Sequence, residues 1–320
     1  MKIITSLALV AALTAVGCEQ QKSRLDNAPK SEHAPKEGNA APGAAPPAAL
    51  KIDRSGTVEQ QLARLQDAYD RNAEAIDFLN KVYGQQKAQQ QAQEAQEPAE
   101  DAMFAVNVAD DIKAGQVDGP ASAPVTVVKA FDFACPYCQR MSGPMEEIVK
   151  EYNGKVRVVY TNLVVHPPAK EAHLASCAAA KQGKYMQFKN SFWEKGYMPY
   201  AQSKGQDVAK LGDDNIYAIA KDVGLDVEKL KTDMKSADCE SRITNDMNEL
   251  QKFHVQATPT FFVNGKFIGG AIPKEQFKKI IDEKLAEAEK SGVPGDKYYD
   301  DVVLAKGEKQ FRSKVDPKPN

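Results

Sequence analysis

The chain has 320 residues and a hydrophobic fraction of 42%, which is enough apolar material for one or two domains with a packed core. Its 42 basic and 44 acidic residues leave a formal net charge of −2, with no long block of one sign. This balance excludes a chain that is disordered throughout, and it gives no basic field that would attract nucleic acid.

The first 17 residues have the pattern of a signal peptide. Lys2 precedes an apolar run from Ile3 to Val16, which is too short for a transmembrane helix of a mature protein. The following "AVGC" resembles the lipobox of bacterial lipoproteins and predicts lipidation of Cys18; ordinary signal cleavage nearby is the alternative. Glu19 stands where an Asp would favour the inner membrane, so the resemblance implies a periplasmic lipoprotein of the outer membrane.

Residues 18–57 are rich in Ala, Pro, Lys and Glu and show no apolar period, which indicates a flexible linker. Residues 58–100 are predicted to be helical, and apolar residues recur there at alternating steps of three and four. Such a heptad pattern is typical of a coiled coil, and a central Asn can set its register or oligomeric state. We expect self-association through this segment, the alternative being an amphipathic helix that folds back on its own domain. The repeat consists of Val58, Leu62, Leu65, Tyr69, Asn72, Ile76, Leu79 and Tyr83.

The globular part begins near Phe104. "APVTVVKAFDF" predicts a buried strand, "CPYCQRMSGPMEEIVKEYNG" a helix with a kink at Pro144, and "KVRVVYTNLVV" a second strand. Residues 168–253 are helical in composition and period. "TPTFFVNGKFIGG" predicts a hairpin that turns at Asn264 and Gly265, and a final amphipathic helix follows. This order of elements indicates an α/β fold with a long helical insertion.

The stretch "FDFACPYCQR" places Cys135 and Cys138 between a strand and a helix. The free N–H groups at a helix start stabilise a thiolate, and Pro136 suits the first helical position because it has no N–H. We therefore expect Cys135 to be an acidic, exposed nucleophile. Cys138, one turn further along, should be more buried and less acidic, and placed to attack a mixed disulfide at Cys135.

Three other interpretations of the cysteines fit the sequence less well. A zinc site of Cys135, Cys138, Cys177 and Cys239 lacks a second close pair, and a copper site lacks nearby Met or His ligands. A structural disulfide within the tetrapeptide would be strained and easily reduced. In an exported chain the four cysteines suggest disulfides, and three pairings are possible.

A second motif is "ATPTFFVNG", in which Thr258 precedes Pro259 at the head of a strand. A cis bond there would direct the Thr258 backbone toward Cys135, where it could pair with an extended substrate segment. The alternative is an ordinary trans proline at the start of a strand.

Together, the motifs around Cys135, Cys177 and Pro259 resemble the DsbA-like thiol:disulfide oxidoreductases, a thioredoxin-like fold with an inserted helical subdomain. The resemblance covers residues 104–287, with the insertion at about 168–253 and a C-terminal tail at 288–320. It implies that Cys135 is the nucleophile, Cys138 the resolving thiol and Pro259 a cis-proline. It also implies a structural disulfide between Cys177 and Cys239, for which two buried free thiols are the alternative.

Within that family, Tyr137, Asp132 and Thr258 resemble the isomerase and reductase branch more than the oxidases. Lys129 departs from the family, in which a carboxylate often stands at this position. We expect its side chain to extend along the strand and place its amine in solvent, the alternative being that its charge favours the thiolates.

We therefore expect an enzyme that exchanges disulfides in exported proteins and is recycled by a membrane redox partner. We expect no cofactor and no metal, since His166, His173 and His254 share no ligand spacing. The alternatives are a lipid-anchored scaffold that binds proteins without turnover, and a copper-handling protein.

Overall fold

The computed structural model describes residues 53–318. The chain divides into two compact units at Glu74 and Ala75, so the described residues form the parts 53–74 and 75–318. The signal peptide, Cys18 and most of the linker lie outside the described residues. Among the residues that are described, no helix has the length and apolar character needed to cross a bilayer.

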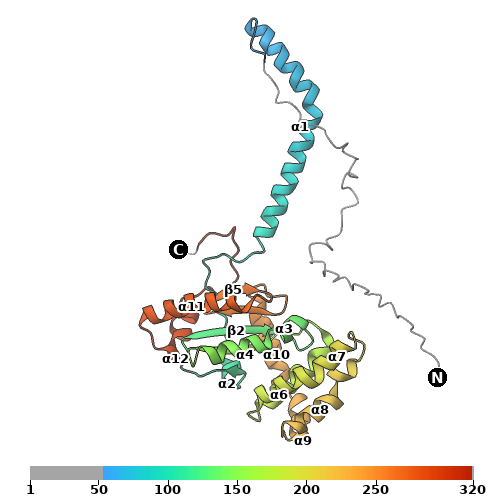
Figure 1. Ribbon diagram of the computed structural model, residues 1–320, viewed down its shortest axis with the longest axis vertical. Helices are drawn as coiled ribbons and strands as arrows, with labels where there is room; N and C mark the ends of the chain where they lie inside the picture. The colour runs from blue at the N-terminus through green and yellow to red at the C-terminus, as the bar shows by residue number, and fades with distance from the viewer. Residues whose placement is uncertain (1–52, 319–320) are drawn as a thin grey trace, which may run out of the picture. The chain divides into compact units, whose positions relative to one another are not determined.

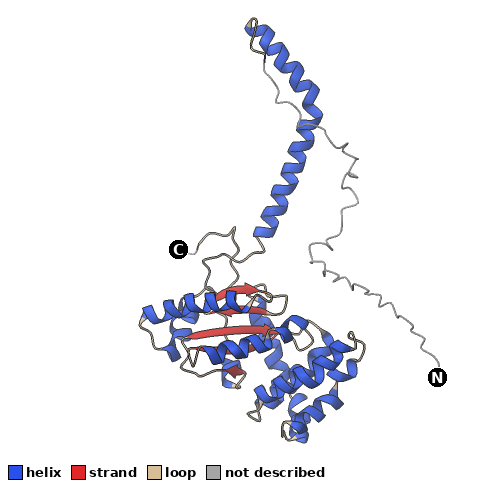
Figure 2. Ribbon diagram, viewed as in Figure 1, coloured by secondary structure: helices blue, strands red, loops and turns tan. Residues whose placement is uncertain are grey.

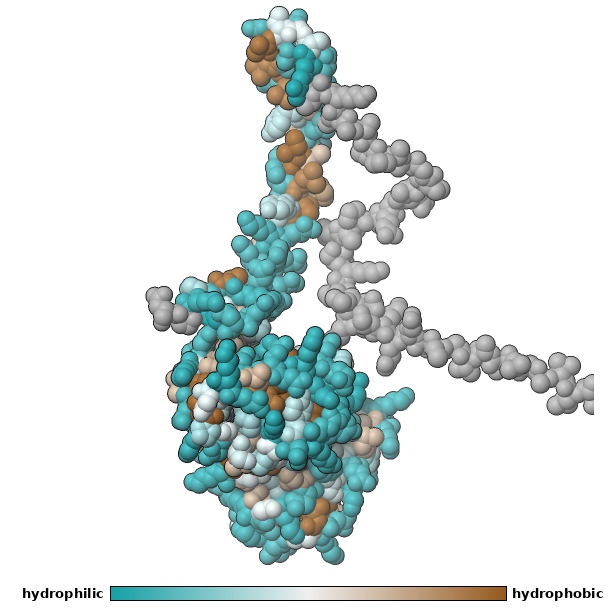
Figure 3. All heavy atoms as spheres, turned by 60° about the vertical axis from the view of Figure 1, so that its left-hand side comes forward, coloured by the Kyte–Doolittle hydropathy of each residue, from teal (hydrophilic) through white to brown (hydrophobic). Residues whose placement is uncertain are grey.

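Helix α1 (Val58–Glu94) begins with a capping box. The Thr57 hydroxyl accepts from the Gln60 amide at 3.4 Å, and the Gln60 side chain accepts from the Thr57 amide at 3.0 Å. The helix ends six residues before the boundary expected at residue 100, and none of its residues is buried. Six members of the heptad repeat are more than half exposed, and apolar surface is visible along the helix in Figure 3. These residues are Val58, Leu62, Leu65, Tyr69, Leu79 and Tyr83.

The second unit is built on a five-stranded sheet with the order β1-β3-β2-β4-β5 (Figures 1 and 2). Central strand β2 pairs in parallel with β3 and antiparallel with β4, and the two edge strands pair antiparallel with their neighbours. The strands are β1 (Val117–Asp118), β2 (Val125–Phe131), β3 (Val156–Asn162), β4 (Thr260–Val263) and β5 (Lys266–Gly269). The predicted strands and hairpin are present, and only the two-residue β1 was not predicted.

Alternation along the strands divides the core into two clusters. Val127, Phe131 and Phe261 point to one face of the sheet, where they join a cluster that includes Cys135 and Cys138. Val128, Ala130, Val159 and Phe262 join a cluster on the opposite face. Because neighbouring strand residues point to opposite faces, the parity of a residue on β2 decides which cluster it enters.

The predicted helix after β2 is two helices, α3 (Pro136–Arg140) and α4 (Ser142–Glu151). The kink expected at Pro144 lies instead at Met141, which ends α3 and precedes α4. Pro144 is thereby placed in the first turn of α4, where a missing N–H leaves no helical hydrogen bond unmade.

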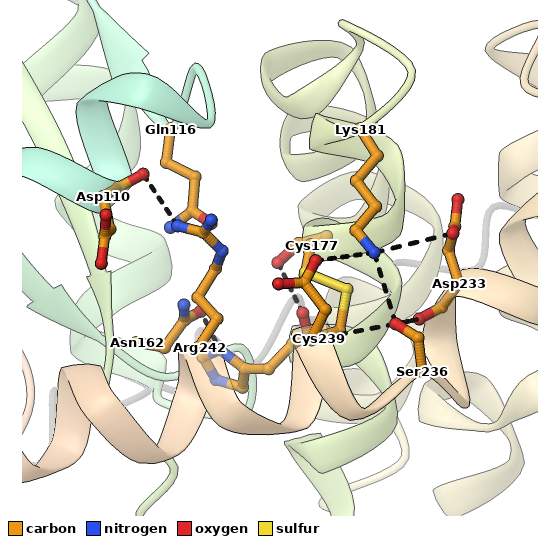
Figure 4. The surroundings of a disulfide bond; sticks show 12 residues. Asp110, Gln116, Asn162, Cys177, Lys181, Asp233, Ser236, Cys239 and Arg242 are labelled. Carbon is orange, nitrogen blue, oxygen red and sulfur yellow. Dashed lines mark hydrogen bonds and ion pairs between the residues drawn. A yellow bond between two sulfur atoms is a disulfide. The ribbon is translucent and has the colours of Figure 1, made fainter.

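The insertion runs through a series of helices between β3 and β4, and Figure 1 shows α6 to α9 grouped together. A disulfide joins Cys177 of α5 to Cys239 of α10, with 5.7 Å between their Cα atoms. Beside it, the amine of Lys181 contacts Asp238 at 2.8 Å and Ser236 at 3.3 Å (Figure 4). The helices are α5 (Lys170–Ala180), α6 (Tyr185–Phe192), α7 (Met198–Gln202), α8 (Asp213–Asp222), α9 (Val227–Met234) and α10 (Ala237–Gln251), with short helical turns at Pro167–Ala169, Trp193–Tyr197 and Val208–Leu211.

The expected tail at 288–320 is largely packed on the second unit. Helix α11 (Lys274–Ser291) crosses the predicted boundary at 287, and α12 (Gly295–Tyr298) and a helical turn (Tyr299–Leu304) follow it. Tyr299 is buried and donates to the carbonyl of Val106, and Phe311 stacks on Phe104 with 5.9 Å between ring centroids. The tail therefore covers the segment that precedes short helix α2 (Ala109–Lys113).

Candidate active site

Cys135 is the N-cap residue of α3, four residues after the end of β2. Its Sγ accepts a hydrogen bond from the Cys138 amide at 3.4 Å, and Pro136 occupies the first helical turn. The side chain of the N-cap residue thus meets a free N–H of the helix start, as the tetrapeptide predicted.

Cys135 is only 3% exposed, so the expectation of an exposed nucleophile was wrong. Its Sγ points toward the carbonyl oxygen of Thr258, 3.2 Å away, and the residue belongs to the same core cluster as Trp193 and Tyr197. Cys138 is fully buried, and neither sulfur is in a disulfide in this structure.

The two thiols have opposite pKa shifts. Hydrogen bonding from the Cys138 thiol is the largest influence that lowers the pKa of Cys135, to about 6; the Thr258 side chain and the amides of Cys138 and Tyr137 add to it. Burial raises the pKa of Cys138 well above its ordinary value, and its hydrogen bond to Cys135 acts in the same direction. At neutral pH the pair therefore carries one thiolate, at Cys135.

The Thr258–Pro259 peptide bond is cis. It lies at the start of β4 and presents the Thr258 carbonyl to Cys135. The Thr258 hydroxyl is buried and has no hydrogen-bond partner within residues 53–318. It is therefore free to donate to the thiolate of Cys135.

Asp132 connects the active-site loop to the segment after β3. Its fully buried carboxylate accepts from the amides of Ala134 at 2.7 Å, Val165 at 2.6 Å and His166 at 2.7 Å. These three bonds satisfy polar acceptors that would otherwise be costly to bury, and they hold the loop that carries Cys135.

His173 supports the same loop from α5. Its Nε2 accepts from the Phe133 amide at 3.3 Å, and its Nδ1 lies 2.8 Å from the Asn162 side-chain oxygen. Burial lowers the pKa of His173 to about 4, so the ring is neutral, with Nδ1 as the donor. Asn162 donates in turn to Asp246 at 2.6 Å. The sequence did not reveal this chain of contacts, because its members come from four separate segments: the loop after β2, and β3, α5 and α10.

Lys129 is 1% exposed, so the expectation that its amine reaches solvent was wrong. Central strand β2 is covered on both faces, and the odd-numbered residues of β2 point to the face that holds the dithiol. The Lys129 amine donates to the carbonyl oxygen of Cys138 at 3.3 Å.

Tyr137 is 41% exposed, and the guanidinium of Arg140 lies 4.3 Å from its ring centroid. In the helical insertion, Phe188, Phe192 and Trp193 are buried. The four-cysteine zinc site is not formed, because Cys177 and Cys239 are bonded to each other. Within residues 53–318 there is no cluster of His, Cys, Asp or Glu suited to a metal ion.

The sequence model of the family described as "Thioredoxin" matches residues 111–283, more than half of the chain. The chain belongs to the thioredoxin family. This assignment confirms the expected thioredoxin-like α/β fold with its helical insertion, and the matched region contains both cysteines of the tetrapeptide and the Thr258–Pro259 bond.

Two curated relatives are Na(+)/H(+) antiporters. The chain is 33% identical over 161 residues to NhaA 1 of Mycolicibacterium gilvum, covering 49% of this chain and 24% of that protein. It is 33% identical over 175 residues to NhaA 3 of Salinispora tropica, covering 54% and 25%. The chain thus spans about a quarter of the length of the curated relatives it matches.

Similar solved structures include a thioredoxin-like oxidoreductase from Silicibacter pomeroyi, with 29% identity, a TM-score of 0.43, and coverage of 52% of this chain and 90% of that one. BdbD from Bacillus subtilis has 26% identity, a TM-score of 0.46, and coverage of 58% and 98%. The catalytic domain of Proteus mirabilis ScsC has 21% identity, a TM-score of 0.45, and coverage of 57% and 99%.

Proposed function

We propose that this protein is a thiol:disulfide oxidoreductase that exchanges disulfides in exported proteins. The observation that carries the proposal is the position of Cys135 at the start of α3. There its pKa is lowered to about 6, while the buried Cys138 lies directly behind it. A thiolate at neutral pH beside a second thiol is the arrangement that disulfide exchange requires.

The first step is attack of the Cys135 thiolate on one sulfur of a substrate disulfide. A bond forms between Cys135 Sγ and that sulfur, the substrate S–S bond breaks, and the second substrate sulfur leaves with the electron pair as a thiolate. The carbonyl of Thr258, 3.2 Å from Cys135 Sγ, lies where it can pair with an extended substrate backbone.

The second step is attack of Cys138 on Cys135. A bond forms between the two protein sulfurs, the mixed disulfide breaks, and the substrate sulfur leaves as a thiolate. The substrate gains two electrons and the protein loses them. Run in reverse, the same steps oxidise a substrate dithiol.

We favour isomerisation of substrate disulfides over net oxidation of substrate dithiols. Support comes from Tyr137, Asp132 and Thr258, which resemble the isomerase branch. Asp132 and Thr258 also contact the active-site loop or Cys135. An isomerase must be kept reduced, so a membrane redox partner would supply electrons to Cys135 and Cys138.

The proposed location is the periplasm, with a lipid on Cys18 that anchors the protein to the outer membrane. Its support is the pattern of residues 1–18 alone. Radiolabelled palmitate incorporated by the native chain and lost with Cys18→Ala is the expected result. Equal incorporation by both chains would contradict it.

We also propose that α1 joins copies of this chain. Six residues of its heptad repeat are more than half exposed, an arrangement that costs free energy unless another surface covers them. Sedimentation should give a larger assembly for the full chain than for a chain without residues 58–86. Equal assembly states for the two proteins would count against this role of α1.

The main experiment is a redox titration combined with refolding of scrambled ribonuclease. We expect native ribonuclease to appear, with a dithiol that titrates as one two-electron couple. Fast oxidation of reduced substrate without reshuffling would assign the protein as an oxidase. A Cys135 that titrates as an ordinary thiol, with no exchange, would reject the enzyme in favour of a binding protein.

A further inference from the structure

Two buried carboxyl groups, Asp111 of α2 and Asp246 of α10, take no part in the exchange steps proposed above. They are 2% and 7% exposed, and a hydrogen bond links them. Asp111 also accepts from the Thr161 hydroxyl and the Gln116 side chain, each at 3.0 Å. The guanidinium of Arg242, drawn nearby in Figure 4, donates to the Asp110 carbonyl at 2.8 Å. Two adjoining buried carboxyl groups cannot both be charged at low cost, so the pair carries one negative charge and one proton.

The proton of this pair lies on Asp111. Burial raises the pKa of Asp111 well above its ordinary value, and the neighbouring charge of Asp246 acts in the same direction. Burial raises the pKa of Asp246 only to about 6, because hydrogen bonds from the side chain and amide of Asn162 favour its charged form. At neutral pH Asp246 is therefore a carboxylate that accepts from the protonated Asp111.

Asp246 begins a chain of hydrogen bonds that ends at the active-site loop. Its Oδ2 accepts from the Asn162 side chain at 2.6 Å and from the Asn162 amide at 3.1 Å. The Asn162 side-chain oxygen lies 2.8 Å from His173 Nδ1, and His173 Nε2 accepts from the Phe133 amide at 3.3 Å. Backbone N–H groups can only donate, so the amides of Asn162 and Phe133 fix the direction of hydrogen bonding at both ends of the chain.

The direction of this chain decides which nitrogen of His173 carries a proton. Burial lowers the pKa of His173 to about 4, so the ring is neutral and has a single N–H. If the Asn162 side chain turned over, its NH2 would face Nδ1, and an Nε2–H would then oppose the Phe133 amide. The carboxylate of Asp246 prevents this reversal, because it can only accept and only the NH2 end of the Asn162 side chain donates.

We propose that Asp246 is a positioning residue for Cys135. Its carboxylate orients the Asn162 side chain and thereby selects the His173 tautomer that accepts the Phe133 amide. Phe133 lies two residues before Cys135, so this bond holds the loop at the start of α3. The effect on disulfide exchange rests on the proposed function of the dithiol, whereas the tautomer of His173 can be measured without it.

The test compares the nitrogen NMR spectrum of the His173 ring in the native chain and in Asp246→Leu. In the native chain at neutral pH, Nδ1 should give the signal of a protonated nitrogen and Nε2 that of an unprotonated one. Asp246→Leu removes the acceptor and keeps a side chain with the same branching. It should show a mixture of tautomers, and hydrogen exchange of the Phe133 amide should become about tenfold faster. A single native tautomer in Asp246→Leu would overturn the proposal.

Asp246→Asn is the conservative variant that should rescue the chain. Its side-chain oxygen can accept from Asn162 while its NH2 donates to Asp111, which then carries the single negative charge. The native tautomer of His173 should therefore persist, and its loss in Asp246→Asn would contradict an effect of hydrogen-bond direction. Asn162→Ala removes the middle link and replaces Asp246→Leu if that variant does not fold. It should give the mixture of tautomers, and a native tautomer there would equally overturn the proposal.

The matched control is Leu250→Ala, which truncates a fully buried apolar residue on the same helix, α10. It should lower the free energy of unfolding and leave the His173 tautomer unchanged, because it removes no hydrogen bond of the chain. A change of tautomer in Leu250→Ala as large as in Asp246→Leu would reject a specific role for Asp246.

The effect on the dithiol is measured as the pH midpoint of Cys135 alkylation. In Asp246→Leu this midpoint should rise by about one pH unit above the native value, because a looser loop weakens the hydrogen bonds that stabilise the thiolate. A changed tautomer with an unchanged midpoint would reject the positioning of Cys135 and leave the proposed exchange chemistry intact. A native chain that titrates as an ordinary thiol while His173 keeps a single tautomer would instead reject the proposed function.

Discussion

Cys135 and Cys138 are separated by two residues at the start of α3, whereas Cys177 and Cys239 are 62 positions apart on α5 and α10. All four residues are at most 3% exposed. Burial therefore does not separate the two pairs. What differs is the hydrogen bonding of each sulfur: Cys135 meets the amide of a helix N-terminus and a second thiol, while Cys177 and Cys239 are bonded to each other. Local hydrogen-bond donors, more than solvent access, therefore make a buried sulfur reactive.

The largest effect is expected from Cys135→Ser. We expect complete loss of disulfide exchange, because a serine hydroxyl is not ionised at neutral pH and cannot form a mixed disulfide. Refolding of scrambled ribonuclease measures this loss of exchange. Exchange that persists would assign the reaction to another sulfur.

The pH dependence of alkylation tests the lowered pKa of the Cys135 thiol. Reaction of Cys135 with iodoacetamide should reach half its maximal rate near pH 6, about three units below an ordinary thiol, because the thiolate is the reactive form. The sign follows from the lowered pKa: the thiolate persists above pH 6 and is lost as the pH falls through it. In Cys138→Ala the largest of the lowering contacts is removed, so the midpoint should rise. A midpoint near 9 in the native chain would contradict the contrast between the pairs.

Removal of the other pair should affect stability and spare the chemistry. Cys177→Ala with Cys239→Ala opens a loop with a sequence separation of 62 and should lower the free energy of unfolding by about 4 kcal/mol in the chain-entropy model. Urea unfolding measures this loss. Ribonuclease refolding at a temperature where the variant is folded should remain close to native. Loss of exchange there would show that the second pair takes part in the reaction.

The smallest effect is expected from Asp132→Asn. One oxygen that accepts a backbone N–H becomes an amide donor, so the variant should lose about 1 to 3 kcal/mol of the free energy of unfolding. Asp222→Asn, which alters an exposed ion pair with Lys195, is the matched control and should cost less free energy of unfolding than Asp132→Asn, because solvent screens exposed ion pairs. Equal losses would mean that Asp132 does not hold the loop of Cys135.

Much of the fold followed from local pattern. The β-rich runs became β2 and β3, and Asn264-Gly265 became the hairpin turn, with both residues at positive φ. These elements are predictable because side-chain periodicity and turn chemistry act over a few residues. The break at Met141 and the packing of the residues after 287 were not predicted, because both depend on neighbours distant in the chain.

The sequence by itself determined that Cys135 stands at the start of a helix and that Cys138 lies one turn behind it, because capping and helical spacing are local. Only the tertiary structure decided what surrounds these sulfurs. Packing covered Cys135, enclosed the amine of Lys129 beneath the dithiol and brought His173 to the Phe133 amide. The physical reason is that burial and hydrogen-bond partners arise from segments far apart along the chain, and these set the charge state of each group.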